Sequence, residues 1–253
     1  MAEPEIRFIT FGISPYCEKA RWALDWHRIP YREIGWPPGL HQILAKRCGA
    51  KSSALPILLE GDTVIQGSSA IIDWAERHAE DRGRMLAPRN GADEAQEIER
   101  RSNEIIAVHV RRLAFAEMLP NYAHFVKPGM FERASGWHRL AGNMMWPVAV
   151  RVMIRNYDLG PGAAAESRSI IDIELDWLDG KLADGRPYLA GERFSRADLA
   201  VASALAAFAQ PKEMPTFYSM RAPERLAADV YRWGERPTMR WVREQYRMHR
   251  LSA

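Results

Sequence analysis

The sequence has little of several features that mark specialised proteins. Only Cys17 and Cys48 among its 253 residues are cysteine. They are too few for a disulfide framework and too far apart in sequence for a redox pair or a zinc knuckle. No apolar run is long enough to span a membrane, and residues 1–5 are acidic where a signal peptide would be basic and then apolar. We therefore expect a reduced, cytoplasmic protein.

An excess of one charge is also lacking, since the formal net charge is only +3 at pH 7. Nucleic-acid binding usually comes with a larger positive charge and a recognisable module, so we predict no nucleic-acid partner. Four arginines, Arg240, Arg243, Arg247 and Arg250, recur at helical spacing and indicate a solvated basic face. The seven histidines show no pair spaced to bind a metal from one helix turn, so we predict no metal site.

The composition, with 47% hydrophobic and 26% charged residues, is typical of an ordinary globular protein. The length of the chain favours two domains. The N-terminal pattern predicts a strand at 6–11, a helix at 15–27 and a strand at 31–34, which together form a βαβ unit. Two further strands, 56–59 and 63–65, flank a tight-turn segment and predict an antiparallel hairpin.

A helix follows the hairpin, because apolar residues from 71 to 78 recur at helical spacing and Ser68 or Ser69 can cap its start. We expect a first domain over 1–82, a polar linker over 83–93 and an all-helical domain over 94–253. In that second domain the pattern predicts helices at 94–119, 140–156, 165–183, 195–208 and 238–249, the fourth opened by a capping box between Ser195 and Asp198.

Ser14 stands where the first strand gives way to the first helix, with Pro15 in the first helical turn. A helix N-terminus offers unpaired N–H groups and the positive end of the helix dipole, so an anion such as a thiolate is stabilised there. The alternative is that Ser14 simply caps the helix.

Four short segments, in this order and spacing, resemble the cytosolic glutathione transferase family, in particular its bacterial serine-type members. They are Ser-Pro-Tyr-Cys-Glu-Lys-Ala-Arg at 14–21, Leu55-Pro56, Gln-Gly-Ser-Ser-Ala-Ile at 66–71, and the segment 188–199. The resemblance implies an α+β fold: a thioredoxin-like N-terminal domain with a mixed four-stranded sheet and helices, followed by an all-α C-terminal domain.

The resemblance also implies an activity, the transfer of glutathione as co-substrate to a hydrophobic electrophile. Ser14 would donate a hydrogen bond to the glutathione thiolate, the backbone of Leu55 would pair with the tripeptide before a cis-Pro56, and Ser68 would hold the γ-glutamyl carboxylate. The implied glutathione site consists of Tyr16, Cys17, Lys51, Leu55, Pro56, Gln66, Gly67, Ser68 and Ser69. The chain departs from the family at two places. Gly67 stands where the family commonly has an acidic or amide residue, and Lys51 lies five residues before Pro56, further away than is usual for the family's basic residue. Lys51 and His41 are therefore only weak candidates for binding the glycyl carboxylate.

For the electrophile we expect a site on the first long helix of the second domain, at Val108, Arg111, Arg112 and Phe115. Trp137 and Trp146 either shape that pocket or fill the helical core. The family further implies a homodimer. Two other functions remain open: a binding or interaction protein without catalysis, and a thiol-disulfide oxidoreductase that uses Cys17. A buried Cys17 thiol with a raised pKa is the simpler interpretation of that residue.

Overall fold

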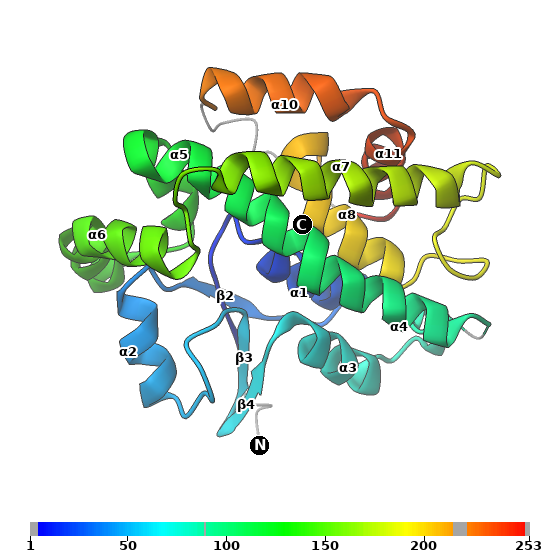
Figure 1. Cartoon of the computed structure of the whole chain (residues 1–253). Coiled ribbons are helices and arrows are strands. Elements are labelled where there is room, and N and C mark those ends of the chain that lie inside the picture. The colour runs from blue at the N-terminus through cyan, green and yellow to red at the C-terminus, as the bar shows by residue number, and fades with distance from the viewer. Residues whose placement is uncertain (1–4, 89, 215–221, 251–253) are drawn as a thin grey trace.

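A four-stranded mixed sheet forms the centre of the N-terminal half in the computed structural model, which describes residues 5–88, 90–214 and 222–250 (Figure 1). Its strands are β1 (Ile6–Thr10), β2 (Arg32–Gly35), β3 (Ile57–Glu60) and β4 (Thr63–Gln66), in the order β2-β1-β3-β4. β1 is parallel to β2 and antiparallel to β3, which is antiparallel to β4. A parallel pair needs a crossover, and α1 (Pro15–Trp26) supplies it.

Helices cover both faces of this sheet because alternate residues of a strand point to opposite sides. Phe8 of β1 faces α1 and α3 (Ser68–His78), where it packs with Leu24 and Ile71. The next residue, Ile9, faces the other side, where its cluster includes Ala45 of α2 (Leu40–Arg47). The predicted βαβ unit and hairpin are confirmed, and α2 is an additional helix within a stretch that the sequence pattern left unassigned.

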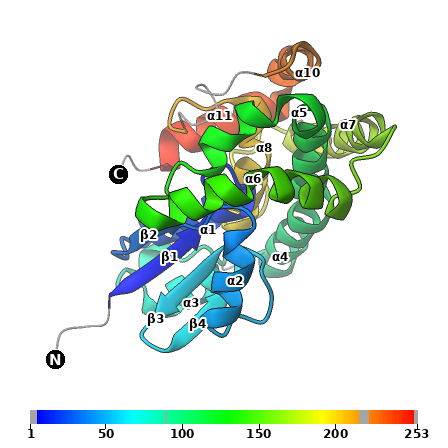
Figure 2. The same cartoon turned by 90° about the vertical axis from the view of Figure 1, so that its left-hand side faces the viewer.

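The rest of the described chain is helical, and Figure 2 shows this helical part packed against the sheet domain. After a short 3-10 turn, η1 (Arg82–Arg84), the elements are α4 (Ala92–Arg101), the π-helical turn η2 (Ser102–Ile106), α5 (Ala107–Met130), α6 (Gly136–Asn156), α7 (Ala163–Leu182), α8 (Arg196–Ala209), α10 (Glu224–Gly234) and α11 (Pro237–His249). Among the described residues, no helix is both long and apolar enough to cross a membrane.

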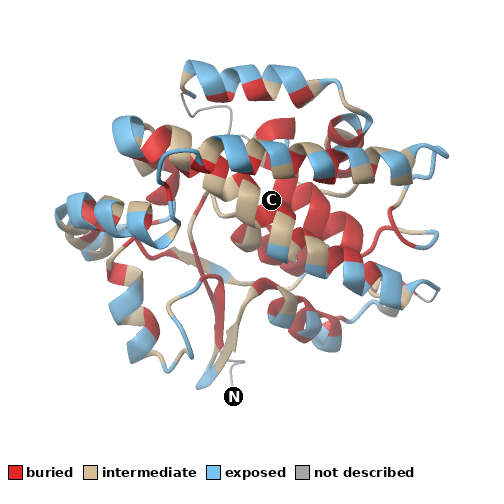
Figure 3. Cartoon of the chain, viewed as in Figure 1, coloured by how far each residue is buried: buried red, intermediate tan, exposed pale blue. Residues whose placement is uncertain are grey.

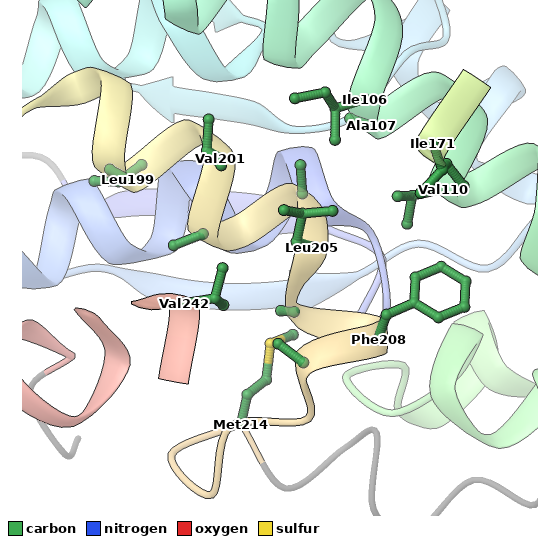
Figure 4. Close-up of a cluster of buried hydrophobic side chains, with 14 of the residues drawn as sticks. Ile106, Ala107, Val110, Ile171, Leu199, Val201, Leu205, Phe208, Met214 and Val242 are labelled. Atoms are coloured by element: carbon green, nitrogen blue, oxygen red, sulfur yellow. The ribbon is translucent and has the colours of Figure 1, made fainter. Parts of the chain in front are cut away.

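Helix α8 forms the centre of this helical core and is buried along most of its length (Figure 3). Its side chains Leu199, Val201 and Leu205 belong to one cluster with Val110 of α5 and Val242 of α11 (Figure 4). The predicted capping box is present at its start. The carboxylate of Asp198 accepts from the Ser195 N–H at 2.8 Å and from the Leu189 N–H at 2.7 Å.

Three details differ from the sequence-based expectation. α5 extends to Met130, past the predicted end at 119, but it is kinked at Tyr122, whose backbone is not helical (φ −128°, ψ 30°). α10 was not predicted. Ser68 is the first residue of α3 rather than its cap, because Gly67, with φ +96°, occupies the N-cap position and no side chain caps the helix.

The solvated basic face predicted on α11 holds for only two of its four arginines. The Arg250 side chain is only 10% exposed and donates to Glu18 Oε1 at 2.9 Å and Asp25 Oδ2 at 2.7 Å, so it fastens the C-terminal helix to α1. Arg243 donates to a backbone carbonyl at 2.8 Å. Arg240 and Arg247 remain exposed. These long-range partners, not the helical spacing, decide which arginines meet solvent.

A buried ionic cluster joins α1 to the helical part and holds the start of α3 in place. Lys19 Nζ donates to Glu99 Oε1 at 2.6 Å, to Asn103 Oδ1 at 3.0 Å and to Ser69 Oγ at 3.1 Å. Arg196 pairs with the other oxygen of Glu99. Burial alone would raise the pKa of Glu99, but Lys19 and Arg196 outweigh it and the pKa is lowered. Glu99 is therefore a carboxylate shared by two cations.

Candidate active site

Ser14 is the N-cap of α1, with an extended backbone (φ −77°, ψ 125°) and Pro15 directly after it. Its Oγ accepts a 3.4 Å hydrogen bond from the Cys17 N–H, the usual contact of a capping serine. Because accepting uses only one lone pair, the hydroxyl proton is still available for donation to an anion. Ser14 is half-buried and its side chain lines a cavity. Capping and anion binding are therefore compatible.

The cavity has a volume of about 600 Å³ and lies between the two halves of the molecule. One wall comes from the sheet domain and includes Ser14, Tyr16 and Leu55, while the opposite wall comes from α5, α6, α8 and α10. The helical wall is mostly apolar, with Phe115 on α5 and Phe208 on α8 among its members. A volume of this size fits a drug-sized organic molecule.

Leu55 lines this cavity next to a proline. The peptide bond between Leu55 and Pro56 is cis, as the resemblance implied. Leu55 itself is 9% exposed, and within the described ranges no hydrogen bond involves its N–H or C=O. A buried peptide group normally has a partner. The arrangement can therefore pair with the backbone of a peptide-like ligand.

Gln66 fixes the loop before Leu55 instead of facing the cavity. Its amide nitrogen donates to the Ser52 carbonyl at 2.7 Å and the Ala54 carbonyl at 2.8 Å, and its amide oxygen accepts from the Ser52 N–H at 3.1 Å. Ser52, Ser53 and Ala54 line the cavity as a result. Lys51, next to this loop, is exposed and is not part of the cavity wall.

His41 of α2 is the other candidate for binding the glycyl carboxylate, and unlike Lys51 it lines the cavity. Its ring packs edge-on against Phe11, with the centroids 5.0 Å apart, and Nδ1 accepts from the Gly39 N–H at 3.1 Å. Burial lowers the pKa of His41 to about 4. The ring is therefore neutral at physiological pH, so it can offer a ligand a hydrogen bond but not a charge.

Ser68 and Ser69 have different surroundings. Ser68 is buried at the α3 N-terminus behind Gly67, and no hydrogen bond of its hydroxyl is found within the described ranges. Ser69 donates to Glu99 Oε1 at 2.7 Å and accepts from Lys19, so its hydroxyl belongs to the ionic cluster. Of the two, Ser68 has the free hydroxyl and the helix N-terminus that favour an anion.

Tyr16 and Arg111 face each other across the domain boundary. The Tyr16 hydroxyl donates to the Asn103 carbonyl at 2.7 Å, and burial raises its pKa. The Arg111 guanidinium lies 5.8 Å from the centre of the Tyr16 ring and 4.5 Å from that of Tyr157. Its Nε is buried and has no hydrogen-bond partner among the described residues. Arg111 thus places a cation with a spare donor in the mostly apolar helical wall of the cavity.

Two of the four residues predicted for the electrophile site line the cavity, Arg111 and Phe115. Val108 does not, and neither does Arg112, which pairs with Glu166 of α7 at 2.5 Å. The sequence prediction missed Val110, Ala114 and Met118 of α5, and Met145, Val148, Ala149, Val152 and Met153 of α6. Trp137 is 57% exposed and Trp146 belongs to the helical core, so neither shapes the cavity wall.

Cys17 points away from the cavity into the sheet-domain core and is fully buried. Burial raises the pKa of its thiol to about 11, although the Ser14 hydroxyl and the Phe11 N–H partly oppose this. The thiolate is the reactive form of cysteine, so this environment disfavours redox chemistry at Cys17. In the described part of the chain, no group of three or more His, Cys, Asp or Glu side chains could hold a metal ion.

Comparison with protein-family models matches residues 8–83 to the glutathione S-transferase N-terminal domain and residues 150–236 to the glutathione S-transferase C-terminal domain. The chain belongs to the glutathione S-transferase family. A search of curated proteins found no match.

Solved structures with the same fold include three that span the chain almost entirely. The beta-etherase LigF from Sphingobium sp. strain SYK-6 is 16% identical with a TM-score of 0.62, and the match covers 95% of this chain and 99% of that one. Human glutathione-S-transferase T1-1, in its apo form, is 16% identical with a TM-score of 0.61, covering 96% and 83%. A glutathione S-transferase from Methylobacterium radiotolerans in complex with glutathione sulfonate is 20% identical with a TM-score of 0.53, covering 93% of each chain.

Proposed function

We propose that this protein is a cytoplasmic glutathione transferase in which Ser14 and the α1 N-terminus stabilise the thiolate of bound glutathione. The observation that carries the proposal is the position of Ser14, which caps α1 and lines a cavity of about 600 Å³ that is also lined by Leu55, whose backbone has no hydrogen bond among the described residues. The structure of a family member with glutathione sulfonate bound supports glutathione as the co-substrate.

The glutathione thiol must ionise before it can attack, and a free thiol has a pKa of about 8.5. A hydrogen bond from Ser14 and the positive end of the α1 dipole both favour the anion. Lowering the pKa by roughly two units corresponds to about 2.7 kcal/mol of preference for the thiolate. In our account Ser14 is thus a hydrogen-bond donor rather than a nucleophile.

We place the tripeptide on the sheet-domain side, reaching from the cavity wall at Leu55 and His41 to Ser68, which lies outside that wall. Leu55 would pair with its backbone, Ser68 at the α3 N-terminus would bind the γ-glutamyl carboxylate, and neutral His41 would donate to the glycyl end. Gln66 and Ser69 would act indirectly, because one fixes the loop before Leu55 and the other belongs to the ionic cluster.

The second substrate would occupy the apolar wall from the helical part, near Phe115. The thiolate attacks its electrophilic carbon, a C–S bond forms, and the leaving group departs with the electron pair of the bond that breaks. Arg111, whose Nε has no partner among the described residues, lies where it can stabilise the negative charge that develops on the electrophile. We also propose that the chain forms a homodimer.

The test is turnover of glutathione with a general aromatic electrophile by wild type, Ser14→Ala and Ser53→Ala. Ser53→Ala is the matched control, because it removes a hydroxyl that also lines the cavity. A hydrogen bond to a charged group is worth about 1.5–3 kcal/mol, so Ser14→Ala should lower turnover about tenfold to a hundredfold at neutral pH. Equal losses in the two variants, or none in Ser14→Ala, would count against the proposal. Glutathione binding without turnover in wild type would favour an interaction protein.

A further inference from the structure

Helix α6 exposes an apolar stripe that nothing in the described chain covers. Trp137, Leu140, Met144, Val148 and Val152 recur every three or four residues, and their exposed fractions range from 38% to 77%. Such spacing places them along one side of the helix. The opposite side of α6 is buried through Gly142, Trp146, Ala149 and Met153. The helix is therefore apolar on both sides, and only one side has a partner in the fold.

Helix α2 lies beside α6 and extends this surface (Figures 1 and 2). Gly142 of α6 meets Pro37, just before α2, so closely that an added Cβ would lie 2.4 Å from the proline Cβ. Ile43 on α2 is 51% exposed and lines the same cavity as Val148 and Val152. We call the exposed side chains Ile43, Trp137, Leu140, Met144, Val148 and Val152 the α2–α6 face.

The two segments that carry this face contain charged residues of one sign. Residues 34–59 and 133–157, which include the whole of α2 and α6, contain no aspartate or glutamate. Both stretches carry exposed basic residues, and none of the following forms an ion pair with any described residue: Lys46, Arg47, Lys51, Arg139, Arg151 and Arg155. Arg151 and Arg155 continue the spacing of the apolar stripe at its C-terminal end.

We propose that the α2–α6 face docks on an anionic lipid surface. A protein surface that combines exposed Trp, Leu, Met and Val with nearby arginines can bury apolar groups at a membrane interface and also attract anionic lipids. The apolar side chains would enter the headgroup boundary and the arginines would pair with lipid phosphates. A symmetric contact with a second copy is disfavoured, because the two segments that carry this face contain no acidic residue that could pair with the partner's arginines.

Docking would also set the orientation of the cavity. Ile43, Val148 and Val152 belong both to the α2–α6 face and to the cavity wall, so the mouth of the cavity would meet the lipid. If the transferase proposal above holds, an apolar second substrate dissolved in the membrane could enter without crossing water. Vesicle binding itself needs neither glutathione nor turnover, so the two proposals succeed or fail separately.

The test is co-sedimentation of the full chain with phosphatidylcholine vesicles, with and without phosphatidylglycerol, at low and high ionic strength. One variant, Trp137→Ser/Met144→Ser, removes exposed apolar groups that do not line the cavity, and a second, Arg151→Gln/Arg155→Gln, removes charge. The matched control, Ile173→Ser/Tyr231→Ser, removes equally exposed apolar groups from α7 and α10.

Wild type and the control should bind anionic vesicles roughly tenfold or more tightly than neutral ones, and more weakly at high salt. Both α6 variants should lose this binding while their melting temperatures stay unchanged. Three results would overturn the proposal: no binding of wild type to anionic vesicles, an equal loss in the control, or a dimer in light scattering that Trp137→Ser/Met144→Ser dissociates without any vesicle binding. The last would assign the face to a second copy of the chain.

Discussion

Replacing Lys19 by methionine tests how the two halves of the molecule are held together. Methionine keeps most of the buried stem of Lys19 but removes the ammonium, which has three partners within 3.1 Å. Removing one partner of a buried ion pair usually costs about 3–5 kcal/mol. Glu99 keeps Arg196 as its second cation, so we expect a cost at the lower end, about 3 kcal/mol.

For a chain of this size, about 3 kcal/mol corresponds to a fall in melting temperature of about 6–12 °C, which calorimetry can measure. Glu99→Gln should cost more than Lys19→Met, because it leaves Lys19 and Arg196 facing each other without their shared carboxylate. Lys181→Met is the matched control, since Lys181 pairs with the exposed Glu94, and an exposed pair contributes about 1 kcal/mol or less. A fall after Lys19→Met no larger than that of the control would refute the reasoning.

The remaining predictions concern packing and pH. Gly142→Ala should destabilise the protein by about 1–3 kcal/mol in urea unfolding, because the new methyl would lie 2.4 Å from the Pro37 Cβ. Gly180→Ala, in α7 with open space around it, should instead stabilise the protein by about 0.5–1 kcal/mol. If both substitutions changed the free energy of unfolding in the same direction, this description of the packing would be wrong. Burial raises the pKa of Asp198 to about 6. The protonated Asp198 therefore contributes up to about 3 kcal/mol to the free energy of unfolding below about pH 4. This contribution is lost as the pH rises through about 6. The free energy of unfolding of wild type, measured relative to Asp198→Asn, should therefore decrease as the pH rises through this range. A difference that does not change with pH would contradict the raised pKa of Asp198.

Much of the fold could be predicted from sequence because the relevant signals are local. Alternating strand patterns, the tight turn around Gly61 and the capping box at Ser195 each act within a few residues, and all three are present. α2 was missed because its eight residues are too few for a clear helical period. The partners of Arg250 lie more than two hundred residues away in sequence, so spacing alone could not show that it is buried.

The site was predicted less completely because it depends on how helices face one another. Of the residues predicted on α5, Arg111 and Phe115 line the cavity, but Arg112 is turned towards α7, where it pairs with Glu166. The π-helical turn before α5 also shifts the helical phase relative to α4, which no residue pattern in the sequence indicated. The ionic cluster around Lys19 likewise joins helices far apart in the chain.

Stabilisation of the glutathione thiolate by Ser14 can be measured directly. We would titrate glutathione into wild type, Ser14→Ala and Ser53→Ala at neutral pH and follow thiolate absorbance in the ultraviolet, with binding measured in parallel by calorimetry. We expect a thiolate signal with wild type and Ser53→Ala that is lost in Ser14→Ala, although that variant still binds glutathione. An equal thiolate signal in wild type and Ser14→Ala would contradict this expectation.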